Sequence, residues 1–351
     1  MQYVLSDEQE ELRTVVRRLL ADRPAARAAY DGGPAPDLEL WGSLVELGVA
    51  GLGVPEHDGG SGGSLVEQVV VAEELGRSLA PVPFVGTALV AHALLAGGAA
   101  AGEEGREALD ALATGTLVGA AVLDGELLVE AEAVSGCLPA VYDAAGATCL
   151  VVQSGSGPVL VGGVEPEPLP SVDRTRPLSA VRVDDHPGRL LGGPGLLGEL
   201  RRRQQTLYAA EAVGVAAWAL EHTAAYTAQR VQFGRPVGTF QAVKHRLADM
   251  LVDVECARSA ALSAAWAADA GDQVDAAMTA AMAQAVATAG AVRVVGAAIQ
   301  LHGGIGVTWE HDLHLYLRRA KALELVAGRP DEHLAHIATT LLGPARQAVS
   351  G

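Results

Sequence analysis

The chain has 351 residues and a formal net charge of −17, and half of its residues are hydrophobic. This length exceeds what one ordinary hydrophobic core supports, so it predicts two or three packed domains. Binding of nucleic acid needs clustered cations, and 25 basic against 42 acidic residues disfavour that class of protein. Only Lys244 and Lys321 are lysines; the other basic residues are arginines, whose planar guanidinium suits carboxylates and phosphates.

The cysteines and the N-terminus bear on where the protein works. Cys137, Cys149 and Cys256 are odd in number and widely spaced, which fits neither a disulfide framework nor a zinc site. The first residues lack the basic and apolar regions of a signal peptide. Asp, Glu and Gln interrupt the alanine-rich stretches before they reach the length of a membrane span. We therefore expect a soluble, cytoplasmic protein without a membrane partner.

The first third of the chain predicts helices. Ser6 and Gln9 form a capping-box pattern, and apolar residues then recur at helical spacing. Further helices are expected through residues 41–47, 66–75 and 89–95, the last running into the Gly/Ala-rich stretch 97–102.

From about residue 117 the pattern changes to short β-branched segments separated by Gly, Pro and Asp. They are residues 117–123, 149–153, 158–162 and 181–183. Their spacing predicts a small antiparallel β-domain, in which Cys137 is expected to be a buried strand residue.

Long helices follow, and we expect them at residues 199–229, 238–271, 273–301, 310–326 and 331–342. Alanine-rich faces allow helices to approach closely, which indicates a bundle. The predicted fold class is therefore mostly α with a small middle β-domain. The predicted domains are residues 1–115, 116–190 and 191–351.

Two segments carry most of the chemical signal. Residues 230–245 place an arginine, an aromatic residue and two glutamines around a glycine turn, a plausible cradle for a pyrophosphate and a flat ring. In residues 300–308 a helix ends in glycines, whose N–H groups an anion can approach without obstruction by Cβ. From the residues alone, both remain helix-terminal turns with a slight preference for an anionic ligand. No residue spacing supports a metal site.

These motifs, taken together, resemble the acyl-CoA dehydrogenase family over almost the whole chain. The segments that carry the resemblance are V-P-E at 54–56, E-E-L-G at 73–76, R-x-Q-F-G-x-P at 230–236 and Q-x-H-G-G-x-G at 300–306. The resemblance implies an N-terminal helical domain, a middle β-domain and a C-terminal four-helix bundle, assembled as a dimer or a tetramer. It also implies FAD shared across a subunit interface, an acyl-CoA substrate, and an electron-transfer flavoprotein as the oxidant.

The resemblance also implies a set of cofactor contacts. Arg230 corresponds to a ligand of the FAD pyrophosphate, donated to the neighbouring subunit's cofactor. Gln232 and Phe233 correspond to contacts with the same cofactor, and Gln241 to a contact on its adenosine side. Gln300, Gly303 and Gly304 correspond to the opposing loop.

The family reaction removes a proton from the α-carbon of the thioester, which requires a carboxylate base. The two positions at which relatives carry that base hold Ala327 and Gln204 here, and neither side chain can act as one. Glu211, about two helical turns beyond Gln204, is the remaining candidate for the catalytic base. The alternative is that Glu211 pairs with an arginine across the bundle or at a subunit interface.

The β-domain departs from the family as well. The segment 120–126 runs almost directly into 131–136, so the flavin and substrate loops that relatives carry there are expected to be deleted. Residues 172–178 still match a strand entry of the family, and we expect Asp173 to Arg176 to form a structural turn network. Such trimming resembles subunits of actinobacterial heteromeric acyl-CoA dehydrogenases, in which two unlike chains share one flavin and handle bulky thioesters, as in steroid catabolism.

Three hypotheses follow from the sequence. The chain is a dehydrogenase subunit acting with a paralogous partner in a heterotetramer, or a self-sufficient homo-oligomeric dehydrogenase that uses Glu211. In the third hypothesis it is an inactive scaffold of the same fold.

Overall fold

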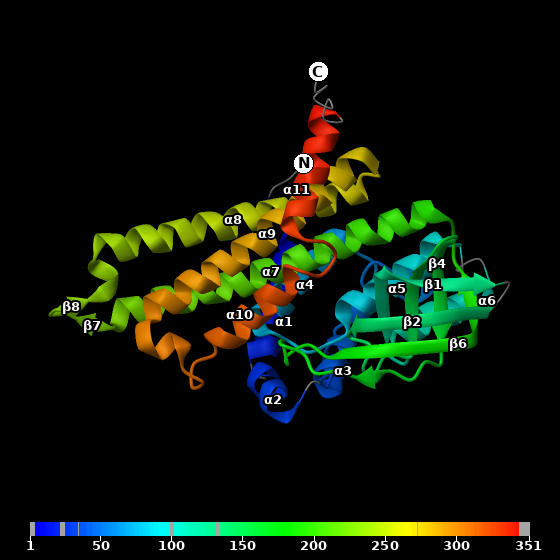
Figure 1. The fold of residues 1–351 in the computed structure, drawn as a ribbon, viewed down its shortest axis with the longest axis horizontal. Coiled ribbons are helices and arrows are strands. Elements are labelled where there is room, and N and C mark those ends of the chain that lie inside the picture. The colour runs from blue at the N-terminus through cyan, green and yellow to red at the C-terminus, as the bar shows by residue number, and fades with distance from the viewer. Residues whose placement is uncertain are drawn as a thin grey trace, which may run out of the picture.

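The computed structural model describes residues 4–21, 25–33, 35–98, 102–130, 133–271 and 273–343. The first three residues of the chain and residues 99–101 of the Gly/Ala-rich stretch lie outside this range. Long helices run side by side across most of the molecule, and a β-sheet lies at one end of them (Figure 1). The order along the chain is helices, strands, then helices, as the sequence predicts.

The N-terminal helices are α1 (Asp7–Ala21), α2 (Ala25–Gly32), α3 (Leu38–Glu46), α4 (Leu65–Ser78), α5 (Phe84–Ala96) and α6 (Glu103–Ala113). The predicted capping box is confirmed: the Gln9 backbone N–H donates to Ser6 Oγ at 3.3 Å, and Ser6 N–H donates to Gln9 Oε1 at 2.9 Å. The sequence analysis missed α2 and α6. Both are short and flanked by Gly or Pro, so neither presents enough turns for its periodicity to stand out.

The strands are β1 (Gly119–Glu130), β2 (Ala133–Tyr142), β3 (Cys149–Ser154), β4 (Gly157–Gly162), β5 (Glu167–Pro168) and β6 (Leu178–Leu190). The sheet order is β2-β1-β3-β4-β6-β5, and an additional β2–β6 pairing closes the sheet on itself. Valines, leucines and alanines from five of the strands form its separate core. Between β1 and β2 only residues 131 and 132 intervene, and they lie outside the described residues, so no long loop connects these strands.

Two expectations about this sheet were wrong. β1 pairs with β3 in parallel, so the sheet is mixed rather than antiparallel. The reason is topological: the chain leaves β2 and crosses back to lie beside β1 before it pairs antiparallel with β4. Cys137 lies in β2 as predicted but is exposed. Side chains alternate along a strand, and its neighbour Leu138 is the residue that enters the core.

The C-terminal helices are α7 (Pro194–Gln229), α8 (Gln241–Asp269), α9 (Gln273–His302), α10 (Leu313–Leu323) and α11 (Pro330–Leu342). By length and composition alone, residues 275–307 could cross a membrane, and 61% of an apolar 18-residue window within this segment is buried inside the protein. The expectation that polar residues interrupt every such stretch was therefore wrong for α9. Its packing against α7 and α8 in the bundle accounts for its apolar composition.

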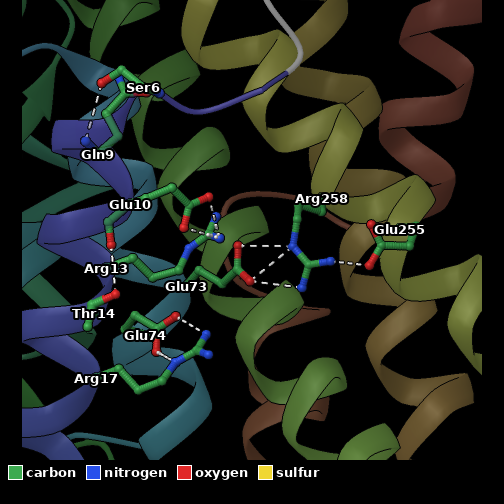
Figure 2. Close-up of polar contacts among 10 residues, drawn as sticks. All are labelled: Ser6, Gln9, Glu10, Arg13, Thr14, Arg17, Glu73, Glu74, Glu255 and Arg258. Carbon is green, nitrogen blue, oxygen red and sulfur yellow. Dashed lines mark hydrogen bonds and ion pairs between the residues drawn. The ribbon is translucent and has the colours of Figure 1, made fainter.

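Two neighbouring carboxylates of α4 connect it to helices on opposite sides. Glu74 accepts two hydrogen bonds from Arg17 of α1, at 2.6 and 2.8 Å, and is 1% exposed. Glu73 accepts hydrogen bonds from Arg258 of α8, the shortest of them 2.9 Å. Figure 2 shows each carboxylate directed toward its own arginine. The adjacent pair in the E-E-L-G segment thus joins the N-terminal helices to the C-terminal bundle.

Candidate functional site

The two glycine-containing motifs meet at the end of the bundle that lies away from the sheet (Figure 1). The first motif follows α7 and forms a two-stranded turn of β7 (Val231–Gln232) and β8 (Arg235–Pro236). The second follows α9. Tyr226, one turn before Arg230, stacks on His302 with ring centroids 4.3 Å apart, and its hydroxyl donates to the His302 carbonyl at 3.3 Å. This contact holds the two motifs together.

Most of the predicted cofactor residues point outward from this end. The Phe233 side chain is 91% exposed and its backbone has a left-handed φ of 55°. Arg230 is exposed, and no carboxylate among the described residues pairs with it. A Cβ added at Gly303 or Gly304 would meet no atom within 4 Å, so the backbone there is open to an approaching ligand. Gln232, Gln241 and Gln300 are exposed as well.

This arrangement fits part of an FAD site. An unpaired guanidinium suits a pyrophosphate, an exposed aromatic ring suits a flat ring system, and open glycine backbone admits both. The helix α7 runs from the sheet to this end of the bundle. Gln204 and Arg230 are about 39 Å apart along it at 1.5 Å per residue. The motifs therefore lie far from any site that this chain forms beside its own sheet.

The second candidate region lies between the sheet, α7 and the segment after α10. Two adjoining hollows of about 190 and 220 Å³ share Asp124, Gln204 and Ala327 in their walls. The first is also lined by Ala121 and Val122 of β1, Ala140, Val141 and Tyr142 of β2, Tyr208 of α7, and Leu325 and Val326. We call the two hollows together the interdomain cavity.

The interdomain cavity contains both positions at which the resemblance places a base. Gln204 and Ala327 come from segments far apart in the sequence, and the fold brings them to one cavity. Ala327 has a left-handed φ of 59°, a strained conformation for a residue with a Cβ. His333 Nε2 lies 3.0 Å from the Ala327 carbonyl oxygen, and the Gln284 side chain donates to the Val326 carbonyl at 2.9 Å. These contacts from α11 and α9 hold the segment against the cavity.

Five polar residues of this cavity escaped the sequence analysis: Asp124, Tyr142, Arg201, Gln205 and Tyr208. Tyr208 follows Gln204 by four residues on α7, so helical spacing alone puts both side chains on one face. That signal was available in the sequence. Asp124 and Tyr142 reach the cavity only because the sheet closes, and nothing local to their segments indicates it.

Glu211 lies apart from the interdomain cavity, in a buried ionic cluster. One of its oxygens accepts from Arg176 of the segment before β6 at 2.8 Å, and the other accepts from Arg319 of α10. Asp143 pairs with Arg176 at 2.8 Å, and Asp173 pairs with Arg319. All five residues are at least nine-tenths buried.

The contacts within this ionic cluster bear on the role of Glu211. Both of its oxygens are engaged by guanidinium groups, and the pKa of Arg176 is raised by the neighbouring Asp143 and Glu211 against the opposing effect of burial. These contacts favour the paired-carboxylate alternative over a base that must accept a proton. The cluster also contains the predicted turn network, in which the Thr175 backbone N–H donates to Asp173 at 3.0 Å.

Comparison with known proteins agrees with this architecture. Residues 6–116 match the acyl-CoA dehydrogenase N-terminal domain, and residues 202–342 match the acyl-CoA dehydrogenase C-terminal domain. The acyl-CoA dehydrogenase IpdE2 of Mycolicibacterium smegmatis is 35% identical over 340 residues, which cover 95% of this chain and 98% of that protein. IpdE2 of Mycobacterium tuberculosis is 36% identical over 94% of this chain and 96% of its own length.

Solved structures share the fold over at least 96% of this chain. A steroid acyl-CoA dehydrogenase, the Tcur3481–Tcur3483 G363A variant, superposes with a TM-score of 0.86 at 30% identity, covering 96% of this chain and 98% of the other. The ChsE4–ChsE5 complex of Mycobacterium tuberculosis has a chain that superposes with a TM-score of 0.88 at 27% identity, covering 99% and 100%. Butyryl-CoA dehydrogenase from Megasphaera elsdenii, at 23% identity and a TM-score of 0.84, shares the fold.

Proposed function

This chain belongs to the acyl-CoA dehydrogenase family, whose cofactor is FAD, and we propose that it is one subunit of a hetero-oligomeric enzyme that shares its flavin site with a paralogous chain. The reaction is α,β-dehydrogenation of a CoA thioester. A base takes the α-proton, and FAD, when bound, accepts the hydride from the β-carbon. The products are the enoyl thioester and the reduced cofactor, which we expect an electron-transfer flavoprotein to reoxidise.

The observation that carries the proposal is the separation of the two candidate regions. Arg230, Phe233 and the glycines after α9 lie at one end of the bundle and point outward. The interdomain cavity lies about 39 Å away along α7. It has no carboxylate at position 204 or 327. The chain thus offers contacts to a cofactor held elsewhere, while its own cavity lacks a carboxylate at the two positions where relatives carry the base, and the carboxylate that does line it, Asp124, is exposed.

Two similar solved structures support a two-chain enzyme. The first is the complex of ChsE4 with ChsE5, and the second is the steroid acyl-CoA dehydrogenase Tcur3481–Tcur3483. By analogy we propose a heterotetramer that acts on a bulky thioester in steroid or lipid catabolism. In it, Arg230 binds the FAD pyrophosphate beside Gln232 and Phe233. Gln241 contacts the adenosine side of the cofactor, and the turn at 303–304 contacts the cofactor from the opposite side.

The experiment compares this chain expressed alone with the same chain co-expressed with a paralogous acyl-CoA dehydrogenase from its genome. We expect no bound flavin in the first preparation. We expect a co-purifying complex with one FAD per pair of unlike chains in the second, bleached by its acyl-CoA. A chain that is yellow alone and bleaches with an acyl-CoA would exclude the proposal and leave the homo-oligomer. If both preparations are colourless and inactive, the remaining hypothesis is that the chain is an inactive scaffold.

A further inference from the structure

A further cavity lies between five helices, apart from both regions described above. It has a volume of about 480 Å³ and is bordered by α1, α2, α4, α7 and α10. These helices contribute, in that order, Arg17, Arg27, Arg77, Trp218 and Tyr316, and we call it the five-helix cavity. Among the described residues, none lines both this cavity and the interdomain cavity. A volume of this size accommodates a small organic molecule.

Helical spacing directs the lining side chains toward the cavity. The lining residues of α4 are Glu74, Arg77 and Ser78, and those of α7 are Trp218 and His222. Residues three or four positions apart lie on the same face of a helix, so each of these helices turns a single face toward the cavity. The lining is therefore built from the side chains of packed helices, which hold it in a defined shape.

Aromatic rings form one part of the lining. The rings of Trp218 and Tyr316 stack with their centroids 3.6 Å apart and an interplanar angle of 5°, and the His222 ring lies 3.9 Å from the Trp218 ring. The Tyr316 hydroxyl donates to the Arg77 carbonyl at 2.7 Å, which fixes the stacked rings to α4. Aromatic side chains favour a flat ring as the body of a ligand.

The charged side chains of the lining leave an excess of positive charge. Three arginines, Arg17, Arg27 and Arg77, stand against two carboxylates, Glu74 and Asp312, which gives a formal charge of +1. The chain as a whole carries −17. The five-helix cavity is thus a local exception on an acidic protein, and its charge favours an anionic ligand.

The arginines also keep hydrogen-bond donors that their carboxylate partners do not take. A guanidinium has five N–H groups, and Glu74 accepts only two hydrogen bonds from Arg17. Glu221 accepts from the two Nη atoms of Arg77, whose Nε–H makes no hydrogen bond with any described residue. Glu221 lies outside the lining and its side chain is 54% exposed, so water screens its charge.

We propose that the five-helix cavity binds a small aromatic carboxylate, with its ring against Trp218 and its carboxylate hydrogen-bonded to Arg77 and the neighbouring arginines. A carboxylate carries one negative charge at neutral pH, which balances the formal charge of the lining. A phosphate monoester carries close to two and would leave an excess of negative charge beside Glu74. The inference does not rest on the proposed function, because all of these residues belong to this chain and the dehydrogenation gives none of them a role.

The test is equilibrium binding of two matched probes, 2-naphthoate and 2-naphthamide, to the full chain by titration calorimetry. The probes share their ring system and their size and differ in charge. We expect naphthoate to bind about tenfold more tightly, the effect of a charge-assisted hydrogen bond. Arg77→Gln should bring the two affinities to within about twofold and leave that for naphthamide unchanged. This variant should fold, because the carboxylate that it releases, Glu221, is exposed to water.

A second variant and a matched control complete the experiment. Arg27→Gln changes another helix of the cavity and releases Asp312, whose side chain is 45% exposed, and it should lower the preference at least about threefold. The control is Arg293→Gln, which breaks an ion pair with Asp253 outside the lining and should keep the tenfold preference. Equal binding of the two probes to the unaltered chain, binding of neither probe, or a tenfold preference that survives both cavity variants would overturn the inference.

Discussion

Gly76 of α4 and Gly214 of α7 lie where these two helices cross, and each faces the backbone of the other helix. A Cβ at Gly76 would lie 2.0 Å from the Glu211 carbonyl oxygen, and one at Gly214 would lie 1.9 Å from the Glu73 carbonyl oxygen. The reciprocal contact lets the N-terminal helices and the bundle approach more closely than any side chain would permit. It also fixes the turn of α7 from which Glu211 reaches the ionic cluster.

The first prediction follows from this crossing. Gly214→Ala should lower the free energy of unfolding by at least about 3 kcal/mol, because the methyl group meets rigid backbone and the helices must separate. Urea denaturation followed by circular dichroism measures the change. Gly296→Ala on α9 is the control. Its Cβ meets nothing within 4 Å, and helix propensity should make it neutral or slightly stabilising. Equal stability of the two variants would contradict the close crossing.

The second prediction concerns Arg230. Arg230→Ala should reduce the FAD bound per co-expressed complex by at least about tenfold and leave thermal stability of the apoprotein nearly unchanged, because the exposed guanidinium has no intramolecular carboxylate partner. The ratio of flavin to protein absorbance measures occupancy. Arg106→Ala removes an exposed arginine of α6 and should have no effect. Normal occupancy in the Arg230 variant would remove this residue from the cofactor site.

The third prediction separates the two roles considered for Glu211. Glu211→Gln removes a charge that two buried arginines share, which should cost about 2 kcal/mol of stability. The rate of flavin reduction in the folded complex should stay within a few-fold of the original. Abolished turnover with intact folding would instead identify Glu211 as the base. The control is Glu221→Gln, which breaks the more exposed pair with Arg77 and should cost less than about 1 kcal/mol.

The fourth prediction is a loss of stability on mild acidification. Burial lowers the pKa of His302, and it is also the main cause of lowered pKa values at His92, His311, His314 and His333. In the unfolded chain an imidazole has its ordinary pKa of about 6.5, so below that pH the unfolded state binds more protons than the folded state. The free energy of unfolding should therefore fall as pH drops from about 7.5 toward 5.5.

Denaturation curves at the two pH values measure this effect. His302→Gln, which keeps a polar side chain at the end of α9, should reduce the difference between them. A stability that rises on acidification, or a slope that His302→Gln leaves unchanged, would contradict the assignment to buried histidines.

Local patterns predicted much of the fold. Three features depend only on neighbours within a few residues and could therefore be predicted from the sequence. They are the capping box at Ser6, the long alanine-rich helices and the short β-branched strands. The parallel pairing of β1 with β3 could not be predicted in this way, because parallel and antiparallel partners require the same strand residues. The exposed position of Cys137 depended on register in the same way.

The sequence by itself determined the family, the two motifs at 230–236 and 300–306 to which the resemblance assigns flavin contacts, and the lack of a carboxylate at positions 204 and 327, because each is a matter of residue identity at a fixed spacing. Only the tertiary structure decided what surrounds them. Glu211 and Tyr208 are one helical turn apart, yet one lies in a sealed ionic cluster and the other lines a cavity. That difference arises because Arg319 and Arg176 come from segments more than a hundred residues apart, and only folding places their charges beside Glu211.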